Sequence, residues 1–66
     1  MGQTRIRELR EEKELTQKQL GKEMGVALNT ISNWERGTRE PDIATIIKLA
    51  EFFEVTTDYL LGVTDY

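Results

Sequence analysis

Hydrophobic and polar positions recur with the period of an α-helix along most of the chain. Apolar residues lie three or four positions apart in five short segments, and no stretch alternates with the period of two that is typical of a β-strand. The segments expected to form helices are residues 4–14, 16–25, 27–36, 42–53 and 56–61. This pattern predicts an all-α domain, a compact bundle of five short helices that uses residues 1–66 as a single unit.

Capping residues support these boundaries. Thr16 and Gln19 have the spacing of a capping box, in which each side chain binds the backbone N–H of the other residue. Gly25 and Gly37 follow the second and third segments, where a left-handed residue commonly ends a helix. Asp42 can cap the fourth helix. The inward face of that helix is expected to consist of Ile43, Ile46, Ile47, Ala50 and Phe53.

The second and third segments predict two short helices that meet at a steep angle. Such a pair needs a small residue where the two backbones approach, and Gly21 provides it. The corner needs a residue that tolerates a positive φ, and Gly25 stands there. The side chains expected to hold the inner surfaces together are Leu20, Met24, Val26, Ile31 and Trp34.

This helix pair resembles the helix-turn-helix of the phage-repressor and Cro-like family, often called the XRE family. The segments that follow the family pattern, in the same order and spacing, are Leu15-Thr16-Gln17, Trp34-Glu35-Arg36-Gly37, Pro41 and Val55-Thr56-Thr57-Asp58-Tyr59-Leu60-Leu61. The resemblance therefore covers nearly the whole chain. It implies a lambda-repressor-like fold and a sequence-specific, repressor-like regulator of transcription. Such a regulator, of bacterial, phage or mobile-element type, binds operator DNA as a homodimer and reads the major groove with residues 27–36.

The net charge of the chain does not favour DNA binding, but the distribution of charge along the sequence is compatible with it. The chain has nine basic and twelve acidic residues and a formal net charge of −3, whereas nucleic-acid binding normally goes with a basic excess. Residues 1–39 nevertheless carry a balance of +2, and residues 40–66 carry a balance of −5. An acidic end turned away from DNA costs little, because charges beyond a Debye length of about 8 Å are largely screened at physiological salt.

The third segment has two sides of different character. At about 100° per residue, Ala27, Ile31, Trp34 and Glu35 share one side, and Asn29, Ser32, Asn33 and Arg36 share the other. Asparagine can pair with N6 and N7 of adenine, so we expect Asn29 and Asn33 to read bases. Ser32 is a further candidate, and Leu28 can contact a thymine methyl group. The alternative for each asparagine is a solvated surface amide, which for Asn29 would also help to cap the helix.

Phosphate contacts are expected at the start of the second helix and the end of the third. Thr16 and Gln17 present backbone N–H groups and the positive end of a helix dipole to an anion. Arg36, Thr38 and Arg39 are the further candidates, with Lys18 a weaker one. For Lys22 the favoured interpretation is a solvated helix face.

The family resemblance also implies a structural ion pair between Arg10 and Glu35, partly buried, that ties the first helix to the third.

Three positions depart from the family pattern. Ala27 replaces the usual Ser or Thr, so a helix cap is lost. Glu54 replaces the glycine that usually ends the fourth helix, which implies strain or a different exit. Phe52 lies off the inward face, so it is expected either to pack under the tail with Val63 or Tyr66 or to form a dimer contact.

Composition excludes several function classes. The chain has no cysteine and no histidine, which removes disulfides, Cys/His zinc sites, thiol nucleophiles and the most frequent general base. Ser32 is the only serine and has no histidine to activate it, so we expect no enzyme activity, cofactor, metal or small-molecule substrate. No apolar run approaches the ~20 residues of a membrane span, and no signal peptide is evident, which predicts a cytoplasmic protein. The alternative function is an antitoxin or adaptor that uses the same fold to hold a protein partner.

Overall fold

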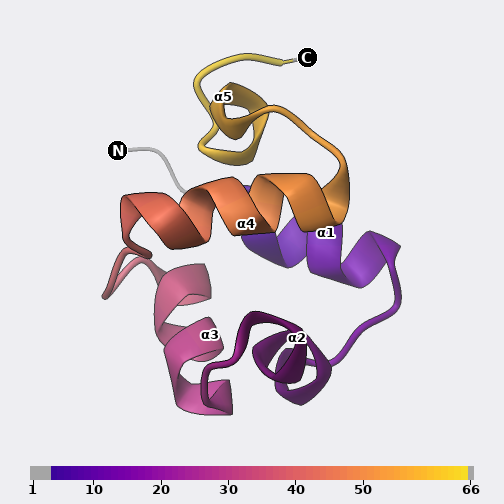
Figure 1. The fold of residues 1–66 in the computed structure, drawn as a ribbon, viewed down its shortest axis with the longest axis vertical. Helices are drawn as coiled ribbons and strands as arrows, with labels where there is room; N and C mark the ends of the chain where they lie inside the picture. The colour runs from indigo at the N-terminus through magenta and orange to yellow at the C-terminus, as the bar shows by residue number, and fades with distance from the viewer. Residues whose placement is uncertain (1–3, 66) are drawn as a thin grey trace.

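The structure is a computed structural model that describes residues 4–65, and these residues form five α-helices and no β-strand (Figure 1). The helices are α1 (Ile6–Glu12), α2 (Gln17–Met24), α3 (Leu28–Arg36), α4 (Ile43–Phe53) and α5 (Thr57–Leu60). The predicted all-α fold is therefore confirmed, and α1 is shorter at both ends than expected. No helix in this part of the chain has the length and hydropathy needed to cross a membrane.

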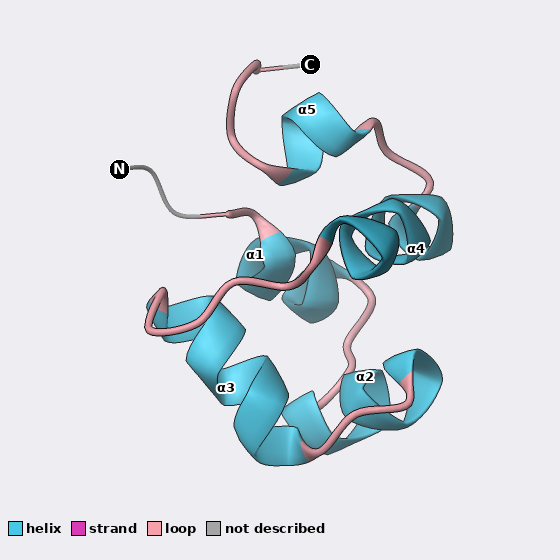
Figure 2. Cartoon of the chain, turned by 60° about the vertical axis from the view of Figure 1, so that its left-hand side comes forward, coloured by secondary structure: helices cyan, strands magenta, loops and turns pink. Residues whose placement is uncertain are grey.

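The helices form two groups on opposite sides of α4. In both ribbon views α5 lies on one side of α4, and α2 and α3 lie on the other (Figures 1 and 2). The pairs that pack most extensively are α2 with α3 and α4 with α5. The acidic C-terminal segment thus lies at the end of the molecule remote from α2 and α3.

Every helix contributes one completely buried side chain to a shared core. These five residues are Ile6, Leu20, Ile31, Leu49 and Leu60. Met24 and Trp34 are also buried, and Val26 packs against the cluster, so the predicted inner surfaces of α2 and α3 are confirmed. Burial of a large apolar side chain contributes about 1.5–3 kcal/mol, and a domain of this size depends on each such contribution.

The predicted inward face of α4 was partly wrong. Ile43 and Ile47 are 76% and 47% exposed, whereas Leu49, which was not expected inside, is completely buried. The helix is apolar on almost every side, so its periodicity does not select a single face. The stripe that packs inward consists of Ile46, Leu49, Ala50 and Phe53.

The predicted caps are present. The Thr16 hydroxyl accepts a hydrogen bond from the Gln19 N–H at 3.0 Å, and the Gln19 side chain accepts one from the Thr16 N–H at 2.8 Å. Asp42 Oδ1 accepts from the Thr45 N–H at 2.8 Å and so begins α4. Hydrogen bonds from the Thr45 side chain and backbone lower the pKa of the Asp42 carboxyl, because they stabilise its charged form.

Two departures from the family pattern have local structural consequences. Ala27 precedes α3 with extended backbone, makes no side-chain cap and is exposed, so its predicted inward position was wrong. A residue that comes before the first turn does not follow the helical wheel. Glu54 ends α4 with a left-handed φ of 60°. The helix therefore keeps the exit that a glycine would provide, at a cost of about 1–2 kcal/mol for a residue with a Cβ.

Phe52 packs against the core beside Phe53 and Lys13. Its ring meets the Phe53 ring edge-on at 5.1 Å, and the Lys13 ammonium lies 5.6 Å from its centre. Val63, a predicted partner, is 70% exposed, and Tyr66 lies outside the described residues. These contacts explain the half-buried position of Phe52 without the tail.

Candidate nucleic-acid interface

The turn between α2 and α3 fixes the angle between these two helices. A Cβ on Gly21 would lie 2.7 Å from the Val26 carbonyl oxygen, so no larger residue fits without a shift of the backbone. Gly25 takes a φ of 76°, and its N–H is bonded to the Gly21 carbonyl. Both glycines are therefore required by the geometry, and α3 lies along an outer side of the fold (Figure 2).

The two sides of α3 differ as the sequence predicts. Ile31 and Trp34 are buried in the core. On the other side, Leu28 is 44% exposed, and Asn29 and Arg36 are exposed. The two remaining candidates for base reading, Ser32 and Asn33, are half-buried.

The Asn33 side chain is already hydrogen-bonded. Its Oδ1 accepts from Arg36 Nη2 at 2.7 Å and lies 3.0 Å from the Thr38 hydroxyl. The Asn33 carbonyl accepts from the N–H groups of Thr38 and Arg39 at 3.0 and 3.3 Å. Asn33 thus joins the end of α3 to three of the predicted phosphate ligands.

The start of α2 lies beside the last turn of α3. Gln17 Nε2 donates a hydrogen bond to Glu35 Oε1 at 3.0 Å, and Glu35 precedes Arg36 in α3. Thr16 is exposed at the same helix start, with its oxygen engaged in the cap. The structure therefore places the start of α2, with Thr16 and Gln17, beside the turn of α3 that carries Arg36.

The implied ion pair between Arg10 and Glu35 is present. Arg10 Nε and Nη2 donate to the two Glu35 oxygens at 2.6 and 3.2 Å, and Arg10 Nη1 donates to the Leu15 carbonyl at 2.6 Å. The two side chains are only 12% and 4% exposed. The bonds to Glu35 raise the pKa of Arg10 above its usual value. Through Gln17, this pair links α1, the start of α2 and the end of α3.

An open hollow beside α2 and the start of α3 places residues outside the predicted site next to the predicted candidates Lys18 and Leu28. We call it the α2–α3 hollow, and its lining is Lys18, Gln19, Lys22, Val26, Ala27 and Leu28. Lys22 is exposed, which agrees with the predicted solvated helix face, and it lines this hollow together with Ala27 and Leu28. The i, i+4 spacing of Lys18 and Lys22 was the available signal, because it places both on one side of α2.

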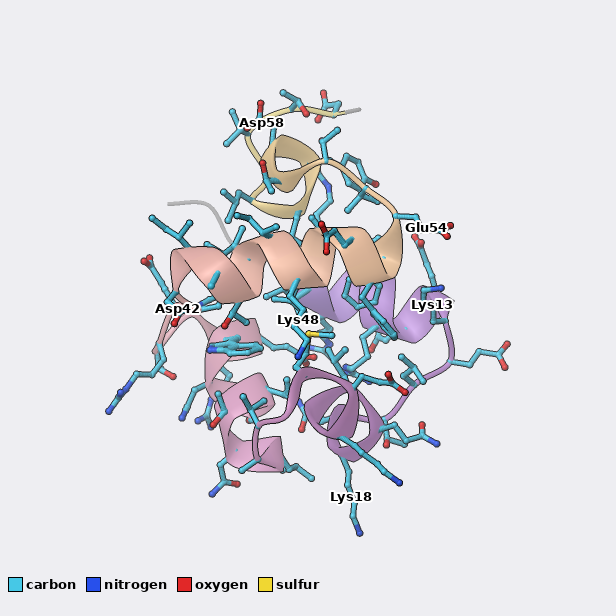
Figure 3. All side chains as sticks on the ribbon, viewed as in Figure 1. Lys13, Lys18, Asp42, Lys48, Glu54 and Asp58 are labelled. Carbon is cyan, nitrogen blue, oxygen red and sulfur yellow. The ribbon has the colours of Figure 1, made fainter. Side chains whose placement is uncertain are left out.

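The charges are separated in space as well as in sequence. Lys18 projects from the α2 end of the molecule, while Asp58 lies at the opposite end and Glu54 at the end of α4 (Figure 3). Both acidic residues are exposed. Over residues 4–65, no group of Asp, Glu, His or Cys side chains is arranged to hold a metal ion.

The helix-turn-helix family model matches residues 6–60. The chain belongs to the helix-turn-helix family. Its curated relatives include transcription regulators and phage repressors. The chain is 41% identical over 58 residues to the HTH-type transcriptional regulator ImmR of Bacillus subtilis, covering 88% of this chain and 46% of that protein. It is 40% identical over 55 residues to the phage CTXphi transcriptional repressor RstR of Vibrio cholerae, covering 83% and 50%.

A solved structure extends the likeness to three dimensions. The helix-turn-helix chain superimposes with a TM-score of 0.83 on the P22 c2 repressor in a crystal structure with a synthetic operator, at 37% identity and 91% coverage of both chains. The chain spans about half the length of curated relatives such as ImmR and RstR. The family consists of transcription regulators rather than enzymes, as expected from the sequence.

Proposed function

We propose that this chain is the sequence-specific DNA-binding domain of a repressor-like regulator of transcription. The observation that carries the proposal is the hydrogen bond between Gln17 and Glu35, since it places the start of α2 beside the last turn of α3. One DNA duplex could then meet the N–H groups of α2, the outer side of α3 and Arg36 together. The operator complex of the P22 c2 repressor, similar in fold and sequence, supports the same interpretation.

Base reading is assigned to the first half of α3, which enters the major groove in helix-turn-helix proteins. Asn29 is exposed and would pair with adenine, a contact that gives about 1–3 kcal/mol of discrimination against other bases. Leu28 would contact a thymine methyl group, and Ser32 would bond a neighbouring base edge. Asn33 follows one turn after Asn29 on this side of α3.

Phosphate contacts position the domain on the duplex. Thr16 and Gln17 would bind one phosphate at the start of α2, near its positive dipole end. Thr16 would donate through its hydroxyl, because its N–H is used in the capping box, and Gln17 would donate through its N–H. Arg36, Thr38 and Arg39 would bind the backbone at the other end of α3. The acidic α4–α5 end would face away from the DNA, so the net charge of −3 does not oppose binding.

The regulator would act as a homodimer in the bacterial cytoplasm on near-palindromic operators. Two copies of α3 about 34 Å apart would then face successive major grooves.

Titration with duplex DNA at increasing salt tests the proposal. Duplexes that bind would first be selected from a random pool, and the affinity for a selected duplex would be measured by fluorescence anisotropy. Arg36 and Arg39 are the cationic members of the proposed phosphate contacts, so if each neutralises one phosphate, log K should fall with log salt at a slope of about −2 per protomer. An adaptor that holds a protein partner would give a flat salt response and no selected sequence, and either result would overturn the proposal.

A further inference from the structure

The end of α3 carries a small hydrogen-bonded cluster, and we infer from it a specific role for Asn33. We propose that Asn33 is a positioning residue that holds Arg36 and Thr38 in place for phosphate contact, rather than a residue that reads a base. The inference rests on the proposed function, because it concerns how the same surface meets DNA.

The orientation of the Asn33 amide is set by its partner. The guanidinium of Arg36 has only donors, so the Asn33 atom that lies 2.7 Å from Arg36 Nη2 must be the oxygen. The Thr38 hydroxyl lies 3.0 Å from the same oxygen. An amide oxygen can accept two hydrogen bonds. On Asn33, one of these acceptor positions faces Arg36 and the other faces Thr38.

A bidentate pair with adenine needs that oxygen free. Asparagine reads adenine by accepting from N6 through its oxygen and donating to N7 through its nitrogen. Asn33 could form this pair only after Arg36 or Thr38 releases that oxygen. Asn29 differs, because it is exposed on the first turns of α3, where no capping bond holds the helix start.

The backbone of Asn33 serves the same cluster. Gly37 takes a left-handed φ of 79° and turns the chain back over the end of α3. The Asn33 carbonyl then accepts the N–H groups of Thr38 and Arg39, and the Thr38 hydroxyl lies 3.2 Å from the same carbonyl. One residue therefore fixes both the path of residues 37–39 and the direction of two polar side chains.

This arrangement lowers the cost of binding. Arg36 is exposed, and immobilising a free arginine side chain on DNA weakens binding by an amount that corresponds to about 2- to 10-fold in affinity. A side chain already held by Asn33 avoids part of that loss. Because phosphates are the same in every sequence, the benefit should not depend on which duplex is bound.

Asn33→Ala tests the inference when it is measured on two duplexes. The first is a 20-bp duplex of random sequence, and the second is a duplex selected by the wild-type protein. We expect Asn33→Ala to weaken both by the same factor of about 2 to 10. We also expect Asn33→Ala to have a smaller effect when Arg36→Ala is already present, because only the contact with Thr38 is then lost. Asn29→Ala, the other asparagine in α3, should give a contrasting result by losing preference for the selected duplex.

A measurement on the free protein tests the positioning of Arg36 without relying on DNA affinity. In the free protein, the Arg36 Nε–Hε group should show a lower heteronuclear NOE in Asn33→Ala than in wild type, because the guanidinium loses its acceptor. Thermal unfolding of both proteins would establish that the variant is folded. An unchanged NOE together with additive effects of Asn33→Ala and Arg36→Ala would overturn the positioning role.

The remaining outcomes separate this inference from the proposed function. If wild type binds DNA with a steep salt dependence but Asn33→Ala loses affinity only for the selected duplex, Asn33 reads a base, and the positioning role is wrong while the proposed function stands. If wild type shows no salt-dependent DNA binding, the proposed function fails, and the positioning role fails with it.

Discussion

The α2–α3 half of the molecule and the α4–α5 half are built from similar helices but present different surfaces. The first presents amides, cations and a helix start, whereas the second presents carboxylates and two exposed isoleucines, Ile43 and Ile47. A net charge of −3 describes neither surface. The comparison shows that the distribution of charge along the sequence indicates the kind of binding partner better than the net charge does. The fold places the two differently charged parts of the sequence at different ends of the molecule.

The strongest test of the α2–α3 half concerns its internal support. Glu35→Ala would leave the Arg10 guanidinium largely buried without its carboxylate, and we expect a loss of about 3–5 kcal/mol in the free energy of unfolding. Urea denaturation measures this loss. Arg7→Ala is the matched control, since it breaks the exposed pair with Glu11, removes no partner of Arg10, and should change stability by less than about 1 kcal/mol. Equal losses would show that the buried pair does not support the interface.

Substitutions in α4 test the corrected inward face. Leu49→Ala should lower the free energy of unfolding by about 2–5 kcal/mol, because a completely buried leucine leaves a cavity. Ile43→Ala removes a side chain of similar size that is 76% exposed, and it should change stability by less than about 0.5 kcal/mol. Both can be measured by denaturation. A large effect of Ile43→Ala alone would restore the inward face expected from the sequence.

Asn29→Ala tests base reading directly. We expect it to lower the preference for a selected duplex over random DNA by about 1–3 kcal/mol, because one bidentate contact is lost. Competition binding with the two duplexes measures the preference. An unchanged preference would remove Asn29 from the base-reading set.

Glu54→Gly probes the strained end of α4. Glycine adopts the left-handed conformation without a Cβ clash, so we expect a gain of about 0.5–1 kcal/mol, partly offset by its greater freedom when unfolded. The change in midpoint on thermal unfolding measures the gain. DNA affinity should stay the same, and a change in it would place α4 at the DNA interface.

The smallest expected effect is the pH dependence of the α4 cap. The folded-state pKa of Asp42 lies below its unfolded value, so its contribution to stability is complete above the unfolded pKa and is lost as the pH falls through the folded one. Asp42→Asn keeps a capping oxygen but does not titrate. The stability advantage of wild type over this variant should therefore shrink on acidification. A constant difference between pH 7 and pH 3 would contradict the lowered pKa.

Local rules predicted the parts of this fold that depend on neighbouring residues. The capping box of Thr16 and the positive φ of Gly25 follow from residues a few positions away, so the helix boundaries and the turn were accessible from the sequence. The inward face of α4 could not be predicted from the sequence, because a helix that is apolar on most sides is oriented by tertiary packing. The distribution of polar residues on α3 was also predicted correctly.

Contacts between distant segments could not be predicted from spacing. Gln17 meets Glu35 across 18 positions of sequence, and nothing in the pattern of either residue indicates the other. The bond between Asn33 and Arg36 is closer, since an i, i+3 pair on one helix can always meet, but its effect depends on the reversal at Gly37 that returns Thr38. The sequence shows that Asn33 has a side chain able to pair with a base, but only the structure shows that the oxygen of this side chain already accepts hydrogen bonds.

The most direct test of the central claim is NMR mapping of backbone amides during titration with a selected duplex. We expect residues 16, 17, 28, 29, 32 and 36–39 to shift or broaden, while residues 43–60 of α4 and α5 keep their positions. Shifts concentrated on α4 and α5, with α3 unchanged, would contradict the claim that the α2–α3 half contacts DNA.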